Sequence, residues 1–317
     1  MRICFSANPP QNRPAGGGAK LTIGLRKYLI EKGHIVEDRF DVNNLPDLIF
    51  MIDPRPLEYT RNWLTIDHIR YIQDNLHLDI PIVHRLNDIG EPKNRPKNYV
   101  PDMIELANRS TCAIHVSDFV KDYYGDAIKT PSHIIHNGVD EKLFTLKEYE
   151  FDKIKLVTHH WSNNDLKGWD IYKKIDDWLD ERQDIEFIFI GNTPDIVVKN
   201  IKVFPPTHGV EMVNLLKQAN VYVTASRYEP CGNHYIEGVA CGLPLLYHRD
   251  GGGVTSMKDF GLAYKDFDEF KVQLENISLN HQQYYDIIKD KFNFYHNVIF
   301  EKYYKLITET ASFDLIR

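Results

Sequence analysis

Short apolar runs recur along the whole chain, and helical patterns separate many of them. Strands that alternate with helices predict a parallel sheet with crossover connections. The pattern occurs twice, so we expect two doubly wound α/β domains. The first series of predicted strands covers 2–7, 48–52, 80–84, 111–117 and 132–136, and the second covers 154–160, 185–191, 201–205, 219–226 and 243–248. Helices are predicted at 21–33, 167–182, 210–219 and 282–309.

The domain boundaries follow from the break between the two series. Residues 145–154 are charged and show no clear periodicity, so we interpret them as a linker. We expect an N-terminal Rossmann-like domain over 1–145, a C-terminal Rossmann-like domain over 146–281 and a final helix over 282–317. A length of 317 residues agrees with two domains, at about 150 residues per domain.

Composition disfavours several classes of protein. The net charge of −7 disfavours binding to duplex nucleic acid, which needs a basic face. The four cysteines are scattered without a C-x-x-C pair, which disfavours structural zinc and a disulfide framework and favours the cytoplasm. No apolar stretch approaches the roughly 18 residues of a membrane span. Arginines and aromatics in 55–73 suit either an interfacial helix at the inner membrane face or, as we favour, a crossover helix.

Polar residues and glycines collect after the predicted strands. Parallel sheets bind ligands beyond the carboxyl ends of their strands, so we expect these residues to converge in a cleft between the domains. In chain order, the sets are Gly16–Gly18, Arg85 with Asn87 and Asp88, Asn137–Asp140, Trp161–Gly168, Arg227 with 229–238, and Gly251–Gly253.

The glycine triplet Gly16–Gly18 lies between a predicted strand and a predicted helix. It fails the phosphate-binding P-loop pattern, because Ala19 and Lys20 follow it, and it fails G-x-G-x-x-G. A flexible turn is one interpretation. The other makes Gly17 and Gly18 part of a donor site, with backbone N–H groups facing a ligand.

The segment EPCGNHYIEGVACGLP (229–244) is the most specific one in the chain. Gly232 and Asn233 can cap a helix whose first N–H groups, near His234, suit a diphosphate. Glu237 could accept hydrogen bonds from ribose hydroxyls, and Glu229 lies closer to the expected sugar position. The alternative, which the residues alone leave open, is that both glutamates only complement the helix dipole.

Three motifs together resemble the family-4 retaining glycosyltransferases. Glu229 and Glu237 form an E-x7-E pattern followed by Ala240–Pro244, Asn137–Asp140 form a turn with Phe144 after it, and Lys167-Gly168 resembles the family's phosphate-contacting lysine. The resemblance implies a GT-B fold, with Lys167 on the diphosphate, Glu237 on the ribose and Glu229 on the donor sugar. It also implies that the final helix packs back on the first domain.

The implied activity is hexosyl transfer, with retention, from a UDP- or GDP-linked donor to a glycan, lipid-linked or other acceptor. We expect no cofactor and no metal, because the chain has no Asp-x-Asp motif in a donor-site context and no H-E-x-x-H. Three alternatives remain open: a sugar-nucleotide epimerase with the same fold, a glycosyltransferase acting on DNA bases, and a non-catalytic sensor of sugar nucleotides.

The chain also departs from the family. Trp161 stands about where many relatives have an arginine, so phosphate charge would rest on Lys167, the helix N-terminus and Arg227. Many relatives carry His-Asp after the strand at 80–84, where this chain has Asn87-Asp88 and its nearest histidine is His84. Asp88 and His84 are therefore the catalytic candidates on the acceptor side.

Overall fold

A computed structural model describes residues 1–9, 17–53, 55 and 63–313. Its internal contacts divide the chain into two units. The first unit comprises Met1–Asn137 together with the chain from His296 onward, and the second comprises Gly138–Tyr295. The chain therefore enters the second unit after Asn137 and returns to the first at its last helix.

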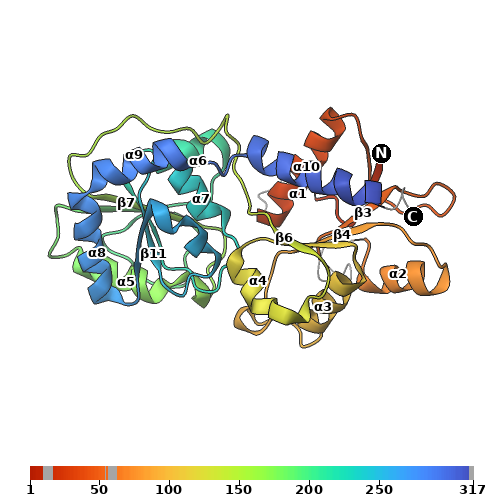
Figure 1. Ribbon diagram of the computed structural model, residues 1–317. Helices are drawn as coiled ribbons and strands as arrows, with labels where there is room; N and C mark the ends of the chain where they lie inside the picture. Colours follow the sequence, from red (N-terminus) through yellow and green to blue (C-terminus); the bar gives the residue numbers. More distant parts are fainter. Residues whose placement is uncertain (10–16, 54, 56–62, 314–317) are drawn as a thin grey trace. The chain divides into compact units, whose positions relative to one another are not determined.

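The first unit contains a six-stranded parallel sheet with strand order β2-β1-β3-β4-β5-β6 (Figure 1). Its strands are β1 (Arg2–Phe5), β2 (Ile35–Glu37), β3 (Leu48–Met51), β4 (Ile82–Leu86), β5 (Cys112–His115) and β6 (Ser132–Ile134). Its helices are α1 (Gly17–Glu31), α2 (Ile66–Arg70), α3 (Tyr99–Arg109), α4 (Asp118–Tyr124) and α10 (His296–Phe313), with short helical turns at η1 (Tyr71–Asn75), η2 (Glu91–Lys93) and η3 (Gly125–Ala127).

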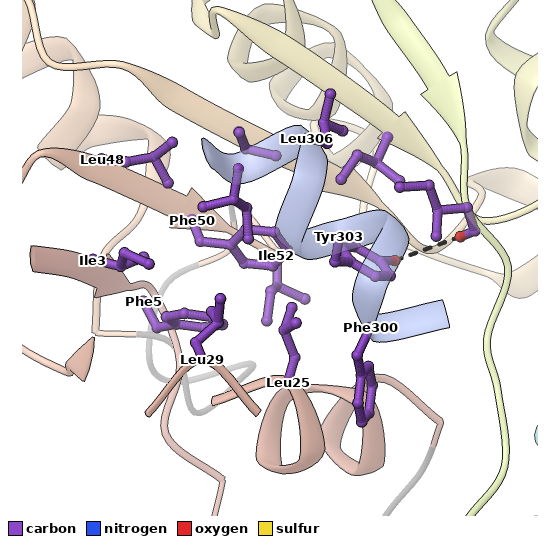
Figure 2. Packing of buried hydrophobic residues seen from close by; sticks show 14 of the residues in the cluster. Ile3, Phe5, Leu25, Leu29, Leu48, Phe50, Ile52, Phe300, Tyr303 and Leu306 are labelled. Atoms are coloured by element: carbon purple, nitrogen blue, oxygen red, sulfur yellow. Dashed lines mark hydrogen bonds between the residues drawn. The ribbon is translucent and has the colours of Figure 1, made fainter. Parts of the chain in front are cut away.

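The core of the first unit forms where α1 and α10 cover one face of this sheet. Residues alternate between the two faces of a strand, and Ile3, Phe5, Leu48, Phe50 and Ile52 share the covered face. Figure 2 shows Leu25 and Leu29 of α1, with Phe300, Tyr303 and Leu306 of α10, gathered around them. At Gly24 an added Cβ would lie 2.6 Å from the Phe300 ring, so a larger residue there would displace that ring of α10.

A buried arginine ties α10 to the sheet. Arg85 in β4 has no exposed surface. Its Nε donates to the hydroxyl of Tyr303 on α10 at 2.9 Å, and its Nη2 donates to Oδ1 of Asn137 at 2.5 Å. Hydrogen bonds to a buried charged group hold more strongly than neutral ones. This network therefore joins the last helix to the strand and to the residue where the chain leaves the unit.

The second unit contains another six-stranded parallel sheet, ordered β12-β11-β10-β7-β8-β9. Its strands are β7 (Lys155–His160), β8 (Glu186–Gly191), β9 (Lys202–Phe204), β10 (Val221–Thr224), β11 (Leu245–His248) and β12 (Gly261–Tyr264). Its helices are α5 (Trp169–Trp178), α6 (Gly209–Leu216), α7 (Asn233–Ala240), α8 (Phe267–Leu279) and α9 (His281–Lys291), with short turns at η4 (Asp165–Lys167) and η5 (Gly253–Phe260).

The strand order of the second unit fixes where a ligand can bind. The sheet starts at β7, extends through β8 and β9 on one side, and then continues with β10, β11 and β12 on the other. β7 and β10 are therefore the neighbours at which the winding reverses. Open α/β sheets bind ligands beyond the carboxyl ends of the strands at such a switch point.

The predicted fold class is confirmed, since both sheets are parallel and helices connect most of their strands. Some boundaries differ. The predicted helix 282–309 is two helices, because residues 292–295 lie between α9 and α10 and pair with the chain after Asn137. The amide of Val139 donates to the carbonyl of Phe294 at 3.0 Å, and Val139 bridges to Tyr295. These backbone groups are then no longer available to a continuous helix.

The predicted linker belongs to the second unit, whose division from the first falls at Asn137 rather than at 145. Within it, the amide of Lys147 donates to the carbonyl of Cys241 at 3.1 Å, and Tyr285 donates its hydroxyl proton to the carbonyl of Lys147 at 2.6 Å.

The segment 55–73 is only partly covered, since 56–62 lie outside the described residues. Ile66 and Ile69 of α2 are buried in the cluster on the sheet face opposite α1, as a crossover helix requires. In the part of the chain that the structure describes, no helix combines the length and apolarity that crossing a membrane demands.

Candidate functional site

The loops after β7 and β10 meet at the switch point of the second sheet. The amide of Arg227 donates to the carbonyl of Leu166 at 2.8 Å. Gly168 ends the η4 turn with φ of 78°, and an added Cβ would lie 2.2 Å from the carbonyl oxygen of Ala225. Glycine is needed here both for the positive φ and for the close approach of the two backbones. The Lys167-Gly168 pair predicted from the sequence is thus fixed against the end of β10.

Lys167 and Glu229 form an ion pair between these two loops. Lys167 Nζ lies 2.6 Å from Glu229 Oε2, and the two side chains are 14% and 17% exposed. Both charges are therefore shielded from bulk solvent yet still reachable. A cation and a carboxylate at this edge can serve different parts of one ligand, since the cation suits phosphate and the carboxylate suits hydroxyl groups.

The glycine run Gly251–Gly253 holds the backbone of Glu229. The amide of Glu229 donates to the carbonyl of Gly251 at 3.1 Å, and the amide of Gly253 donates to the carbonyl of Glu229 at 2.7 Å. At Gly253 an added Cβ would lie 2.0 Å from the carbonyl oxygen of Pro230. These glycines therefore let the loop after β11 pass close enough to fix the position of Glu229.

α7 begins beside this pair, at Asn233, with Gly232 as its N-cap residue. The first amides of a helix have no partners within the helix and carry its positive dipole end. The Oδ1 atom of Asn233 and the Oγ atom of Ser226 are buried and have no hydrogen-bond partner among the described residues. The start of α7 therefore offers both donors and acceptors for a polar ligand.

A chain of hydrogen bonds runs from Glu237 to His234 through two residues of the sheet. Glu237 is 2% exposed, and its Oε2 lies 2.8 Å from Nε2 of His159. The hydroxyl of Tyr222 lies 3.1 Å from Nδ1 of His159 and 3.1 Å from Nδ1 of His234. Burial, with the nearby Lys167 charge, holds the pKa of His234 well below its usual range.

Arg227 is held by a carboxylate at the start of α5. Its guanidinium pairs with Asp170, with distances of 3.0 and 2.7 Å to the two carboxylate oxygens. The carbonyl of Trp161 accepts a hydrogen bond from Nδ2 of Asn192 at 2.7 Å. Both cations predicted for the donor site thus form ion pairs in this structure, Arg227 with Asp170 and Lys167 with Glu229.

His84, predicted as a catalytic candidate, lies inside β4 with no exposed surface. Neither ring nitrogen has a partner among the described residues, and burial lowers the pKa of His84 to about 3. The ring is neutral at neutral pH, and no substrate can reach it in this structure. This geometry gives His84 a place in the core of the first sheet rather than a catalytic position.

Asp88, the other candidate of the first unit, follows β4 and is 6% exposed. It pairs with Arg95, and Lys93 Nζ lies 3.7 Å from its Oδ1. The amide of Ile89 also donates to its carboxylate at 3.0 Å. These contacts occupy both carboxylate oxygens of Asp88 and fix its position, which suits the residue to orienting a ligand.

The structure thus separates the predicted site residues into two groups. Lys167, Arg227, Glu229, Gly232, Asn233, His234 and Glu237 lie in the second unit, around the ends of β7 and β10. His84, Asp88, Gly17 and Gly18 lie in the first unit, the two glycines at the start of α1. Gly16 lies outside the described residues.

Sequence reasoning missed His159 and Tyr222. Their signals were present, because His159 belongs to a His-His pair at the end of a predicted strand and Tyr222 lies between two valines in another. Nothing local in the sequence connected these two residues to Glu237.

As to metals, no group of three or more histidine, cysteine, aspartate or glutamate side chains within the described ranges is arranged to hold an ion.

No protein-family model and no curated protein sequence matches the chain. Solved structures do resemble it in fold. Sucrose-phosphate synthase from Thermosynechococcus elongatus is 13% identical, with a TM-score of 0.69 over 97% of this chain and 98% of that one. HepE from Anabaena, in complex with UDP, is 15% identical, with a TM-score of 0.68 over 98% of this chain and 100% of that one.

The catalytic domain of starch synthase IV from Arabidopsis thaliana, bound to ADP and acarbose, is 12% identical. Its TM-score is 0.70 over 98% of this chain and 99% of that one. The likeness to all three spans nearly the whole chain. The expected GT-B fold is therefore confirmed, while identities this low leave activity to be argued from the site.

Proposed function

We propose that the protein is a glycosyltransferase that moves a sugar from a nucleotide donor to an acceptor, with the donor bound by the second unit. The observation that carries this proposal is the Lys167–Glu229 pair beside the start of α7, at the switch point between β7 and β10. A cation and the N-terminal amides of a helix suit a diphosphate, and a carboxylate suits the hydroxyl groups of a sugar. UDP and ADP are bound by structures of the same fold.

In the proposed complex Lys167 exchanges Glu229 for a phosphate oxygen. Glu229 then accepts a hydrogen bond from a hydroxyl of the donor sugar. The family resemblance assigns Glu237 to the ribose. Because Glu237 is 2% exposed and hydrogen-bonded to His159, little of its surface is open to a ribose, and its main contribution is expected to pass through His159.

We further propose that the sugar is transferred with retention at its anomeric carbon. An inverting enzyme needs a base on the acceptor side to take the acceptor proton. His84 is buried and Asp88 is paired with Arg95, so neither is placed as such a base. Lys167, Glu229 and α7 can instead stabilise the leaving diphosphate and the developing charge on the sugar ring. The acceptor proton then passes to a phosphate oxygen.

Stereochemistry is tested by proton NMR of early product made from an α-linked donor. An α-linked product is expected, and a β-linked one would refute retention and return Asp88 to the role of base.

The function itself is tested in two stages. Thermal shift with UDP-glucose, GDP-mannose and ADP-glucose should identify a donor, because ligand at about 100 times its Kd adds about 2.7 kcal/mol to stability. The donor found is then incubated with candidate acceptor glycans and lipid-linked sugars. A new glycoside supports the proposal. An isomerised sugar nucleotide without a glycoside would instead make the protein an epimerase.

A matched pair of variants shows whether the stabilisation comes from the proposed site. Lys167→Ala should reduce the thermal shift markedly, because weaker donor binding stabilises the protein less at the same ligand concentration. Lys173→Ala on α5 should leave it intact, since Lys173 pairs with Asp177 on the surface of that helix. Equal loss in both variants would refute the assigned donor site.

A further inference from the structure

Three elements of the second unit contribute to one hydrogen-bond chain that ends beside the proposed donor site. β7 contributes His159, β10 contributes Tyr222, and α7 contributes His234 and Glu237. Tyr222 and His159 are buried, with 0% and 3% exposure, and Glu237 is buried as well. The amide of His159 also donates to the Tyr222 hydroxyl at 3.2 Å, which adds a fixed donor to the chain.

With both rings neutral, one arrangement of protons satisfies the hydrogen bonds that Glu237, His159, Tyr222 and His234 make with one another. The Glu237 carboxylate only accepts, so the proton of His159 lies on Nε2 and its Nδ1 accepts. The Tyr222 hydroxyl, whose pKa burial raises far above its usual value, then donates to Nδ1 of His159. Its oxygen still accepts from the ring of His234, so His234 carries its proton on Nδ1. The Nε2 atom of His234 is left as an acceptor.

This Nε2 atom is buried and has no partner among the described residues. The ring of His234 lies over Gly232, where an added Cβ would approach Nε2 to 2.7 Å. Lys167 and Glu229 are close enough to act electrostatically on the ring. A buried acceptor without a protein partner is costly, and this one lies beside Gly232, the N-cap residue of α7.

We propose that Glu237, His159 and Tyr222 are positioning residues that hold His234 in the Nδ1–H tautomer, so that its Nε2 accepts a hydrogen bond from a hydroxyl of the bound nucleotide sugar. The ligand in this inference rests on the proposed function, whereas the tautomer does not. Glu237 thereby acts on the donor through His234. The hydroxyl belongs either to the donor sugar or to the ribose, and binding experiments separate these two sources.

Imidazole nitrogen NMR of the ligand-free protein tests the tautomer. The resonances of His234 are identified by their loss in His234→Gln. A protonated Nδ1 and a bare Nε2 are expected, and a protonated Nε2 would overturn the proposal. In Tyr222→Phe the preference should be lost and both tautomers should appear. Unchanged resonances in that variant would equally overturn it.

Tyr264→Phe is the matched control for Tyr222→Phe. Tyr264 is equally buried, lies in the same sheet, and donates its hydroxyl proton to the carbonyl of Thr224 at 3.1 Å, outside the chain of hydrogen bonds. It should leave the His234 resonances unchanged. A change in this control equal to that in Tyr222→Phe would show a general response of the sheet and would overturn the assigned role of Tyr222.

Binding tests the ligand. His234→Asn keeps an atom near Nδ1 but loses Nε2, so affinity for UDP-glucose, GDP-mannose or ADP-glucose should fall about 2- to 13-fold, as for one neutral hydrogen bond. His234→Gln carries an oxygen near the Nε2 position and should restore part of this loss. Unchanged affinity in His234→Asn would overturn the ligand assignment.

Comparison with UDP, GDP and ADP separates the two hydroxyl sources. A loss confined to the sugar nucleotides assigns the hydroxyl to the donor sugar, and an equal loss for the diphosphates assigns it to the ribose. If none of these nucleotides binds the unaltered protein, the proposed function and the ligand of His234 both fail. The NMR result still decides the tautomer in that case.

Discussion

The two units each contain a buried polar network built on a tyrosine hydroxyl, and the two networks end differently. In the first unit Arg85 reaches Tyr303 and Asn137, joining β4, α10 and the end of the unit. In the second unit the chain from Glu237 ends at a ring nitrogen of His234 with no partner among the described residues. The Arg85 network thus stabilises the fold of the first unit, whereas the chain from Glu237 is proposed to serve a ligand.

The ends of the strands show the same contrast. Asp88, after β4, is occupied by Arg95, Lys93 and a backbone amide. Glu229, after β10, meets Lys167, a group that a diphosphate can draw away. Position relative to the switch point explains the difference, because only there do two neighbouring strands send their connections in opposite directions and leave a crevice between them.

The largest effect is expected from Glu229→Gln. Loss of an electrostatic contact that strengthens in the transition state should lower kcat by about 100- to 1,000-fold, with a smaller change in KM. Steady-state kinetics measures both. Asp88→Asn in the first unit should lower kcat much less. The reverse order of effects would contradict the contrast drawn between the two strand ends.

Lys167→Ala should weaken nucleoside diphosphate binding by about 10- to 150-fold, the range for a hydrogen bond to a charged group. Titration calorimetry gives the affinity directly. Unchanged affinity, with normal thermal stability, would remove Lys167 from the donor site. Arg227, which pairs with Asp170, would then be the remaining candidate cation.

Tyr303→Phe should lower the free energy of unfolding by about 1–3 kcal/mol, because it leaves the buried Arg85 without one of its acceptors. Donor affinity should stay the same, since this network belongs to the first unit. Tyr304→Phe is the control, because Tyr304 is half-buried on the same helix and lies outside that network. Chemical denaturation that shows equal losses for the two variants would contradict the structural role of the Arg85 network.

Acid should destabilise the first unit through its buried histidines. Burial lowers the pKa of His84 to about 3 and that of His115 to about 4, against about 6.5 in an unfolded chain. Each ring stays neutral in the folded state, so stability is complete above pH about 6.5 and falls as pH drops toward the folded pKa. The expected slope is about 1.4 kcal/mol per pH unit for each ring.

The variant His84→Leu should remove the contribution of one ring to this slope. Unfolding measured between pH 6.5 and 4 therefore gives a flatter curve for the variant than for the unaltered protein. An identical pH dependence in the two proteins would mean that His84 is protonated in the folded state.

The smallest effect is expected from a chelator. Lys167 and the first amides of α7 supply the positive charge that a diphosphate needs, so EDTA should leave transfer unchanged. An assay with and without EDTA, followed by addition of magnesium or manganese, measures this. Activity lost with EDTA and restored by either ion would show that the second unit needs a metal to balance the donor.

Part of the site could be predicted because it is local in sequence. Glu229, Gly232 and Asn233 lie within five consecutive residues, so a loop end and a helix start could be inferred from them directly. Lys167 was found in the same way, next to Gly168. Their pairing was not predictable, since it depends on β7 and β10 becoming neighbours although β8 and β9 come between them in the chain.

For other features, the sequence indicated where they lie but not which contacts they make. The sequence predicts that the run Gly251–Gly253 gathers with the polar residues at the strand ends, and the structure shows that it fixes the backbone of Glu229. The helix predicted over 282–309 breaks at residues 292–295 because that stretch pairs with the chain leaving Asn137, a contact between segments far apart in sequence.

The sequence by itself determined the two parallel α/β sheets, the helix after Gly232 and the Lys167 and Glu229 candidates, because apolar periodicity and turn residues act over a few neighbours. Only the tertiary structure decided that Glu237 faces His159, that Arg227 faces Asp170 and that His84 is enclosed in the first sheet. Burial and partnership of a charged group depend on which strands and helices become neighbours, and that order is set by packing of the whole unit.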